Sequence, residues 1–290
     1  MMTQRQQFVR TEIEGVSLPR MLIGTNWLLG WSHTSAAADK QIRERYVKPA
    51  DFFPVFSAYM EHGIDAVMGM YSQSDLFADA VQYAQDKLGK KIIVIDTPSI
   101  NVNDSKEARA EAETLISKSA KMGSTFCLIH HSRCEQLVNK NKQSIERIGD
   151  YTQMIRDAGM IPGLSAHMPE IVVYSDLNEY DVQTYIQIYN PMGFLMQVEI
   201  EYIARIIHQA KKPVMTIKPF AAGRCTPYVG LNFVWNTLRP CDMVTVGAAT
   251  PDEVIEDIEI SFAALERRYP DIEGRTSPNQ SQDAFGKTKA

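Results

Sequence analysis

The stretch TFCLIHH, residues 125–131, sets the pattern for the whole chain. Four apolar residues run directly into two histidines, His130 and His131. A short, continuous apolar run is typical of a parallel strand that is buried on both faces, and the polar residues that follow mark where the strand leaves the core. Seven other segments have the same character: 21–26, 64–70, 91–97, 160–167, 184–190, 214–220 and 242–248.

Amphipathic segments that predict helices alternate with these strands, among them 51–63, 74–89, 105–123 and 251–269. Several predicted helices end at a glycine, which readily adopts the left-handed conformation of a helix C-terminus. Eight strand–helix units in about 250 residues predict an α/β fold of the (β/α)8 TIM-barrel type. An open, doubly wound sheet is the second choice, because no Gly-x-Gly-x-x-Gly motif follows the first strand.

The composition fits one large domain. The chain has 290 residues, of which 44% are hydrophobic and 22% are charged. We predict a single barrel over residues 1–270, followed by a polar, mobile tail over residues 271–290, where apolar periodicity is missing.

The net charge of −5 gives no reason to expect a nucleic-acid partner. No apolar run approaches the roughly 18 residues that span a bilayer. The N-terminal residues lack the apolar core of a signal peptide, so we expect a cytoplasmic protein. We also expect its partner to be a small-molecule substrate. The oligomeric state stays open.

Several motifs, taken in order, resemble those of the aldo-keto reductases. They are RTEIEGVSLPRMLIGTNWLLG (10–30), LIHH (128–131), IYNP (188–191), KPFAAG (218–223) and VTVGAATPDEVIEDI (244–258). The resemblance covers roughly residues 8–268 and implies a TIM barrel whose bottom is closed by an N-terminal β-hairpin.

That family reduces carbonyl groups with a nicotinamide cofactor, using an Asp, a Tyr, a Lys and a His. The resemblance places the histidine at His130 and the tyrosine at Tyr71. The aspartate position falls near Met68, and the lysine position falls at Asp96 or Thr97. Because the lysine and aspartate lower the pKa of the tyrosine, their loss implies a barrel with altered chemistry.

On the cofactor side, the resemblance implies contacts to NAD(P) from Ser165, Tyr189, Gly223, Gly247 and Thr250. Tyr189 corresponds to a residue that stacks on nicotinamide, although packing at the barrel rim explains it equally well. The helix after Thr250 begins with the acidic residues Asp252 and Glu253, which repel a 2′-phosphate. We therefore predict that NAD(P) binding is weakened.

Chemistry in a TIM barrel occurs at the carboxyl ends of the strands. Asp96, His130 and His167 end the third, fourth and fifth predicted strands, and we expect them to converge. One carboxylate and two neutral imidazoles suit a divalent metal, and a hydrogen-bonded cluster without a metal is the alternative. Lys218 ends the seventh strand and is predicted to contact an anion, with a Schiff base or an ion pair with Asp96 as alternatives.

The segment 26–51 after the first strand is long for this fold and carries Trp27, Trp31 and His33. It predicts either a lid over the substrate or a small extra helix. Together these features predict an enzyme that uses acid–base or metal-assisted chemistry on a polar oxygenated substrate such as a sugar or hydroxy acid. An NAD(P)H-dependent carbonyl oxidoreductase and a non-catalytic small-molecule-binding barrel are the alternatives.

Overall fold

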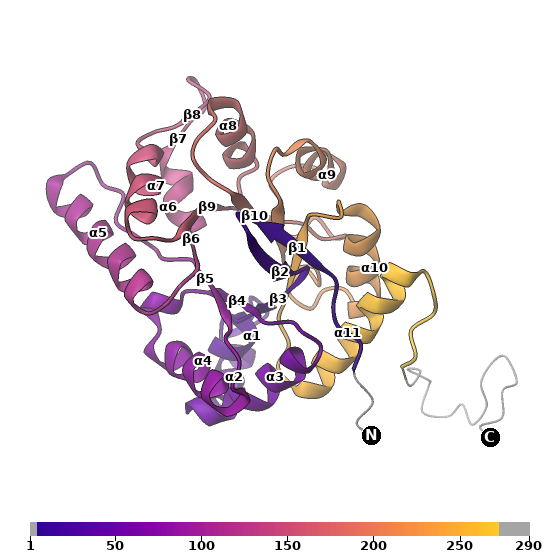
Figure 1. The fold of residues 1–290 in the computed structure, drawn as a ribbon. Coiled ribbons are helices and arrows are strands. Elements are labelled where there is room, and N and C mark those ends of the chain that lie inside the picture. The colour runs from indigo at the N-terminus through magenta and orange to yellow at the C-terminus, as the bar shows by residue number, and fades with distance from the viewer. Residues whose placement is uncertain (1–4, 273–290) are drawn as a thin grey trace, which may run out of the picture.

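The computed structural model describes residues 5–272, so most of the predicted tail at 271–290 lies outside the described residues. Eight parallel strands form a closed barrel, in the order β10-β11-β12-β3-β4-β5-β6-β9 (Figure 1). The strands are β3 (Met21–Gly24), β4 (Ala66–Gly69), β5 (Ile93–Asp96), β6 (Phe126–Ile129), β9 (Ile161–Ala166), β10 (Thr184–Ile188), β11 (Val214–Ile217) and β12 (Met243–Val246). Each one lies within a strand predicted from the sequence, and the (β/α)8 fold is confirmed.

A layer of helices surrounds the barrel (Figure 1). The helices are α1 (Asn26–Leu29), α2 (Ala36–Arg45), α3 (Pro49–Glu61), α4 (Asp75–Leu88), α5 (Lys106–Lys121), α6 (His131–Cys134), α7 (Ile148–Asp157), α8 (Glu170–Asn178), α9 (Ile200–Gln209), α10 (Pro227–Thr237) and α11 (Pro251–Glu266). Two 3-10 turns, η1 (Tyr71–Gln73) and η2 (Glu135–Leu137), and a short ribbon of β7 (Val138–Asn139) and β8 (Ser144–Ile145) complete the fold. No helix in the described part of the chain is long and apolar enough to cross a membrane.

Strand alternation divides the apolar residues into two clusters. Side chains of successive strand residues point to opposite faces, so one set fills the barrel and the other packs against the helices. The inner cluster includes Leu22, Ile95, Phe126 and Met215. Gly163 also belongs to this interior, because a Cβ there would lie 2.6 Å from the Leu128 side chain.

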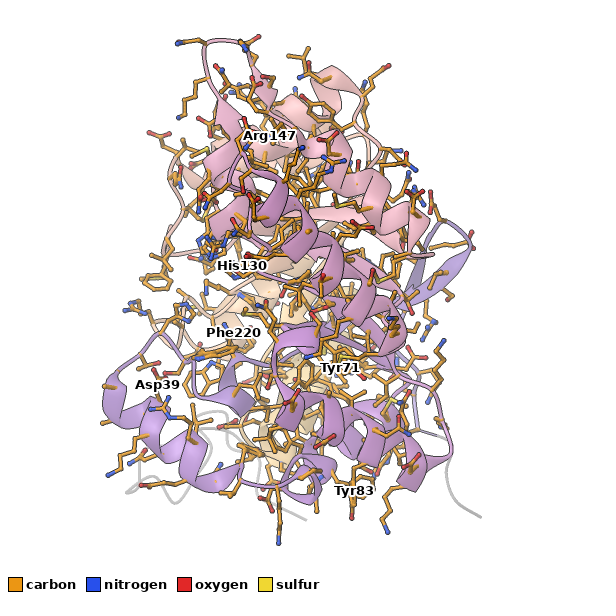
Figure 2. All side chains as sticks on the ribbon, turned by 90° about the vertical axis from the view of Figure 1, so that its left-hand side faces the viewer. Asp39, Tyr71, Tyr83, His130, Arg147 and Phe220 are labelled. Atoms are coloured by element: carbon orange, nitrogen blue, oxygen red, sulfur yellow. The ribbon has the colours of Figure 1, made fainter. Side chains whose placement is uncertain are left out.

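The N-terminal hairpin closes the bottom of the barrel. It consists of β1 (Arg10–Ile13) and β2 (Val16–Pro19), paired antiparallel. Ile13 and Leu18 are buried in the inner cluster, and Arg10 donates a hydrogen bond to Asp65 just before β4. In Figure 2 the hairpin and His130 lie on opposite sides of the molecule. The hairpin that the family resemblance implied is therefore confirmed.

Candidate active site at the barrel mouth

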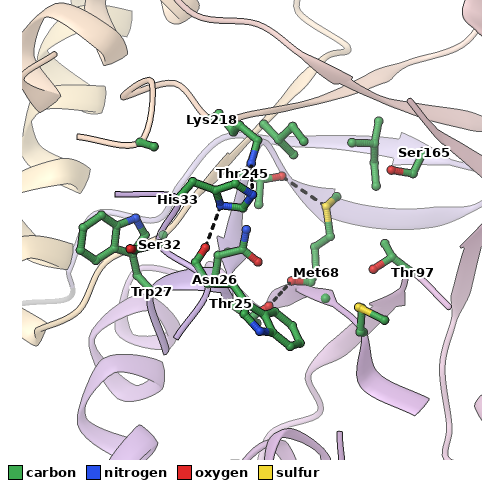
Figure 3. A pocket seen from close by; sticks show the side chains of 18 of the residues that line it. Thr25, Asn26, Trp27, Ser32, His33, Met68, Thr97, Ser165, Lys218 and Thr245 are labelled. Atoms are coloured by element: carbon green, nitrogen blue, oxygen red, sulfur yellow. Dashed lines mark hydrogen bonds between the residues drawn. The ribbon is translucent and has the colours of Figure 1, made fainter. Parts of the chain in front are cut away.

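A cavity of about 490 Å³ opens at the carboxyl ends of the barrel strands. Its floor is apolar and includes Met68, Ile186 and Ile217. Figure 3 shows Thr97 and Ser165 on one side of the cavity and Lys218 with His33 on the other. The volume suits a small metabolite, and the mixed lining is typical of a site that holds one by shape and by a few polar contacts.

His130 and His167 both line this cavity, as the sequence predicted. They follow neighbouring strands, since β6 pairs with β9 and Ile129 stands opposite Leu164. The ring of His130 is fixed through Nδ1, which lies 2.8 Å from Ser132 Oγ. Burial is the main cause and electrostatic repulsion from the neighbouring imidazole of His131 the second; together they lower the pKa of His130 to about 4 and that of His167 to about 3. Both imidazoles are therefore neutral at pH 7.

His131 is a further residue of the cavity lining, and it was not among the predicted site residues. The chain turns into α6 at this residue, which brings the ring into the cavity instead of onto the outer face of the strand. Its ring stacks on that of His167, with 3.7 Å between centroids and 15° between planes. The ring centroid of His130 lies 4.3 Å from that of His131. Three histidines thus stand together at the mouth.

Glu135 anchors this group and was also missed. Its Oε1 accepts hydrogen bonds from the backbone nitrogens of His167 at 2.6 Å and Met168 at 2.9 Å. Its Oε2 lies 4.0 Å from His131 Nδ1. The signal was present in HHSRCE (130–135), because a His and a Glu four residues apart face the same side of a helical turn.

Lys218 faces the histidines from the end of β11. Its φ of 61° lies in the left-handed region. The backbone therefore departs from the strand at Lys218, and the side chains of the two successive residues Ile217 and Lys218 both line the cavity. Its Nζ lies 3.3 Å from His33 Nε2. Burial lowers the pKa of Lys218 to about 8, so the amine is mostly charged at pH 7. A half-buried lysine with a positive φ and a lowered pKa is characteristic of functional sites.

The segment after β3 forms one wall of the cavity. It contains the helices α1 and α2, in agreement with the prediction of a small extra helix, and Trp27, Trp31 and His33 line the cavity. Asp39 of α2 holds the segment in shape by accepting hydrogen bonds from the backbone nitrogen and the hydroxyl of Ser32.

Asp96 does not join the histidines, and the predicted convergence of Asp96, His130 and His167 is wrong in this respect. Asp96 shares a strand face with Val94, which packs among the outer apolar residues, so its side chain points to the helix layer. There it accepts a hydrogen bond from the backbone nitrogen of Ser72 at 3.3 Å. Burial raises its pKa, an effect partly offset by hydrogen bonds from Ser119 and Ser72. Thr97, one residue later, faces the cavity instead.

Tyr71 also lies outside the cavity, contrary to the role that the family resemblance implied. It is buried in η1, stacks edge-on against Phe77 and donates a hydrogen bond to the backbone oxygen of Met122 at 3.3 Å. Figure 2 shows it away from His130 and Phe220, which mark the mouth. Of the family's four catalytic residue types, only the histidine, at His130, is kept in the lining, where Met68 and Thr97 stand at or near the aspartate and lysine positions.

The predicted cofactor residues separate into two groups. Ser165 lines the main cavity, and Gly247 lines both this cavity and a second one of about 350 Å³ beside it. Gly223 lines the second cavity alone.

Tyr189 and Thr250 have structural contacts instead. The hydroxyl of Tyr189 bonds to Thr237 Oγ1 and its ring packs on Phe233, both from α10, so packing is the correct interpretation of this tyrosine. Thr250 Oγ1 accepts a hydrogen bond from the backbone nitrogen of Glu253 and caps α11.

Comparisons with known proteins agree with this architecture. No family model matches the chain, and no curated protein matches it in sequence. A structure of a candidate aldo-keto reductase from Pseudomonas aeruginosa superposes with a TM-score of 0.65 at 12% identity, covering 91% of this chain and 99% of the other. A second such structure from the same organism gives 0.66 at 12% identity, covering 90% and 97%.

Aldose reductase from Giardia lamblia gives a TM-score of 0.54 at 11% identity, covering 88% of this chain and 89% of the other. Identities this low support a shared fold and leave the activity open. The chain thus shares the fold of these aldo-keto reductases, a TIM barrel that here has an N-terminal hairpin.

Proposed function

We propose that this chain is an enzyme that binds a small oxygenated carboxylate, such as a sugar acid or hydroxy acid, and carries out acid–base chemistry at the barrel mouth. Lys218 binds the carboxylate, and the histidines accept hydrogen bonds and protons from the substrate hydroxyl groups. The observation that carries the proposal is the position of Lys218, a half-buried cation that faces neutral imidazoles across the cavity.

The charge distribution supports an anionic ligand. Within residues 5–272, no carboxylate lies within ion-pair distance of Lys218, whose one hydrogen-bond partner is His33. A half-buried cation without an acidic partner loses part of its hydration, and an anionic ligand would offset that loss. Thr97, Ser165 and Asn26 add hydroxyl and amide groups to the lining, which suits the hydroxyl groups of the same ligand.

Carbonyl reduction with NAD(P)H is less well supported. The tyrosine that would donate the proton, Tyr71, is bonded to a backbone oxygen in the helix layer. The acidic residue and the lysine of the family's catalytic set are also missing from the cavity lining. A fluorescence titration with NADPH separates the two activities, because micromolar binding would favour the reductase.

A binding panel tests the proposal. Isothermal titration calorimetry compares glycerate with glycerol and gluconate with glucose, so that each acid has a neutral partner of similar shape. We expect an acid to bind and its neutral partner to bind at least about tenfold more weakly, since a charged hydrogen bond contributes about 1.5–3 kcal/mol. The variant Lys218→Met should lose this preference, and Lys90→Met, at an exposed position, should keep it.

Turnover distinguishes an enzyme from a binding protein. Incubation of the bound acid with wild-type protein, followed by NMR spectroscopy, should reveal a changed product. Binding of an acid without any conversion would favour a non-catalytic barrel. Equal affinity for acids and neutral sugars would remove the basis of the proposal.

A further inference from the structure

Three potential metal ligands meet beside the cavity. His131 and Glu135 lie one helical turn apart, at the starts of α6 and η2, and His167 follows β9. One ligand atom from each residue lies within 4.8 Å of the other two. A single point therefore lies within about 2.8 Å of all three atoms, compared with about 2.0–2.2 Å for zinc bound to nitrogen or oxygen. Completing the coordination requires the side chains to reorient, above all the rings of His131 and His167.

The carboxylate is held in a suitable orientation. Both hydrogen bonds from the backbone of His167 and Met168 go to Glu135 Oε1, which leaves Oε2 directed at His131. Hydrogen bonds to the outer atoms of ligands are a regular feature of metal sites, because they fix the ligand before the metal arrives.

His131 supplies a second, independent observation. Its Nδ1 is buried and has no hydrogen-bond partner within residues 5–272. A buried polar atom without a partner costs about 1–3 kcal/mol, and such atoms in native proteins call for an explanation. A bound cation at this position would satisfy the nitrogen lone pair.

We infer that His131, Glu135 and His167 bind one divalent metal ion of the zinc type at the edge of the cavity. Two imidazole nitrogens and one carboxylate oxygen form a donor set that suits zinc and similar transition metals. Three protein ligands leave at least one coordination position open for a substrate oxygen. The role toward substrate rests on the proposed function, and metal binding itself does not.

Metal binding has a structural consequence. The rings of His131 and His167 are now nearly parallel, with an interplanar angle of 15°. Imidazole lone pairs lie in the plane of the ring, so stacked rings cannot both point at one ion. Loading with metal should therefore tilt the two rings apart while the Glu135 contacts to the backbone stay in place.

Titration of chelator-treated protein with Zn²⁺ and Co²⁺ tests the inference. We expect one equivalent by calorimetry, and a visible absorption spectrum of four- or five-coordinate cobalt. The variants His131→Ala, His167→Ala and Glu135→Gln should each weaken binding by roughly tenfold or more. The control His130→Ala removes a neighbouring ring of the same cavity, and His208→Ala removes a distant one bonded to Thr237; both should bind as the wild type does.

Glu135→Gln keeps an oxygen for the two backbone hydrogen bonds, so it is the variant of choice if an alanine variant misfolds by circular dichroism. The inference is overturned if wild type binds neither ion, or if the three ligand variants bind as tightly as the two controls. Failure of the metal site leaves the Lys218-dependent preference for acids intact. Loss of that preference with a normal cobalt spectrum would remove the proposed function alone.

Discussion

Glu135 fixes the end of the fifth barrel strand, because its Oε1 accepts a hydrogen bond from the backbone nitrogen of His167 at 2.6 Å. The same carboxylate accepts a second hydrogen bond from Met168. One side chain from the turn after β6 thereby sets the position of the residue that follows β9. The stacking of His131 on His167 depends on this connection.

Removing this carboxylate should destabilise the protein. Glu135→Ala leaves two partly buried N–H groups without a partner and should lower the free energy of unfolding by about 1.5–3 kcal/mol, whereas Glu135→Gln should lower it less. Urea denaturation measures the difference, and Glu113→Ala, at an exposed position of α5, is the control. Equal free energies of unfolding for all three variants would show that the hydrogen bonds of Glu135 to the backbone do not stabilise the protein.

Binding of acids should depend on the protonation of Lys218. Burial lowers its pKa to about 8, so the cation is present below pH 8 and is lost as the pH rises through that value. The titratable groups that line the same cavity are His33, at 3.3 Å, together with Asp39, His130, His131 and His167. The pKa values of His33, His130 and His167 are lowered, so these three imidazoles are neutral at pH 7 to 9 and the charge of Lys218 changes in this range.

Calorimetry at pH 6.5 and 9.5 measures this effect. The affinity of wild type for the acid should fall by about tenfold between these values, as the charged hydrogen bond disappears. The arginine of Lys218→Arg stays charged from pH 6.5 to 9.5, so the affinity of this variant for the acid should be the same at both pH values. An identical pH response in Lys218→Arg and wild type would assign the titration to another group.

Asp96 should affect stability and leave ligand binding unchanged. Its pKa is raised in the folded state by burial, so the charged form is disfavoured and its contribution grows more unfavourable as the pH rises above the unfolded value of 3.8. Asp96→Asn removes this effect. The stability of the variant relative to wild type should therefore increase between pH 4 and pH 7 in urea denaturation. Loss of acid or metal binding in Asp96→Asn would place the residue back in the site.

The hairpin should behave as part of the barrel core. Leu18 is fully buried in the inner cluster, so Leu18→Ala should lower the free energy of unfolding by about 2–5 kcal/mol. Val9→Ala, at a position that is 44% exposed, should change it little. If both variants unfold at the same urea concentration, the hairpin contributes nothing to the barrel.

The fold was predictable because continuous apolar strands alternate with helices that have clear start and stop signals. Ser105 and Thr250, for example, cap α5 and α11 through their hydroxyl oxygens. The direction in which polar side chains point at the strand ends was harder to predict. Asp96 is the last residue of β5, so the strand alternation directs its side chain away from the barrel interior. Tyr71 lies in a 3-10 turn that packs on the helices.

His131 and Lys218 illustrate the opposite case. Both would face outward if their strands continued, and both line the cavity because the backbone leaves the strand at that residue. His131 begins a helix, and Lys218 adopts a positive φ that a non-glycine residue rarely shows. Sequence periodicity carries no information about such a departure, so the structure was needed to show that both side chains face the cavity, although Lys218 had been predicted as an anion contact.

A crystal structure with the bound acid tests the central claim most directly. The account predicts the carboxylate of glycerate or gluconate at about 2.7–2.9 Å from Lys218 Nζ, with a hydroxyl group directed at the histidines. A carboxylate bound elsewhere, with Lys218 still contacting only His33, would contradict it.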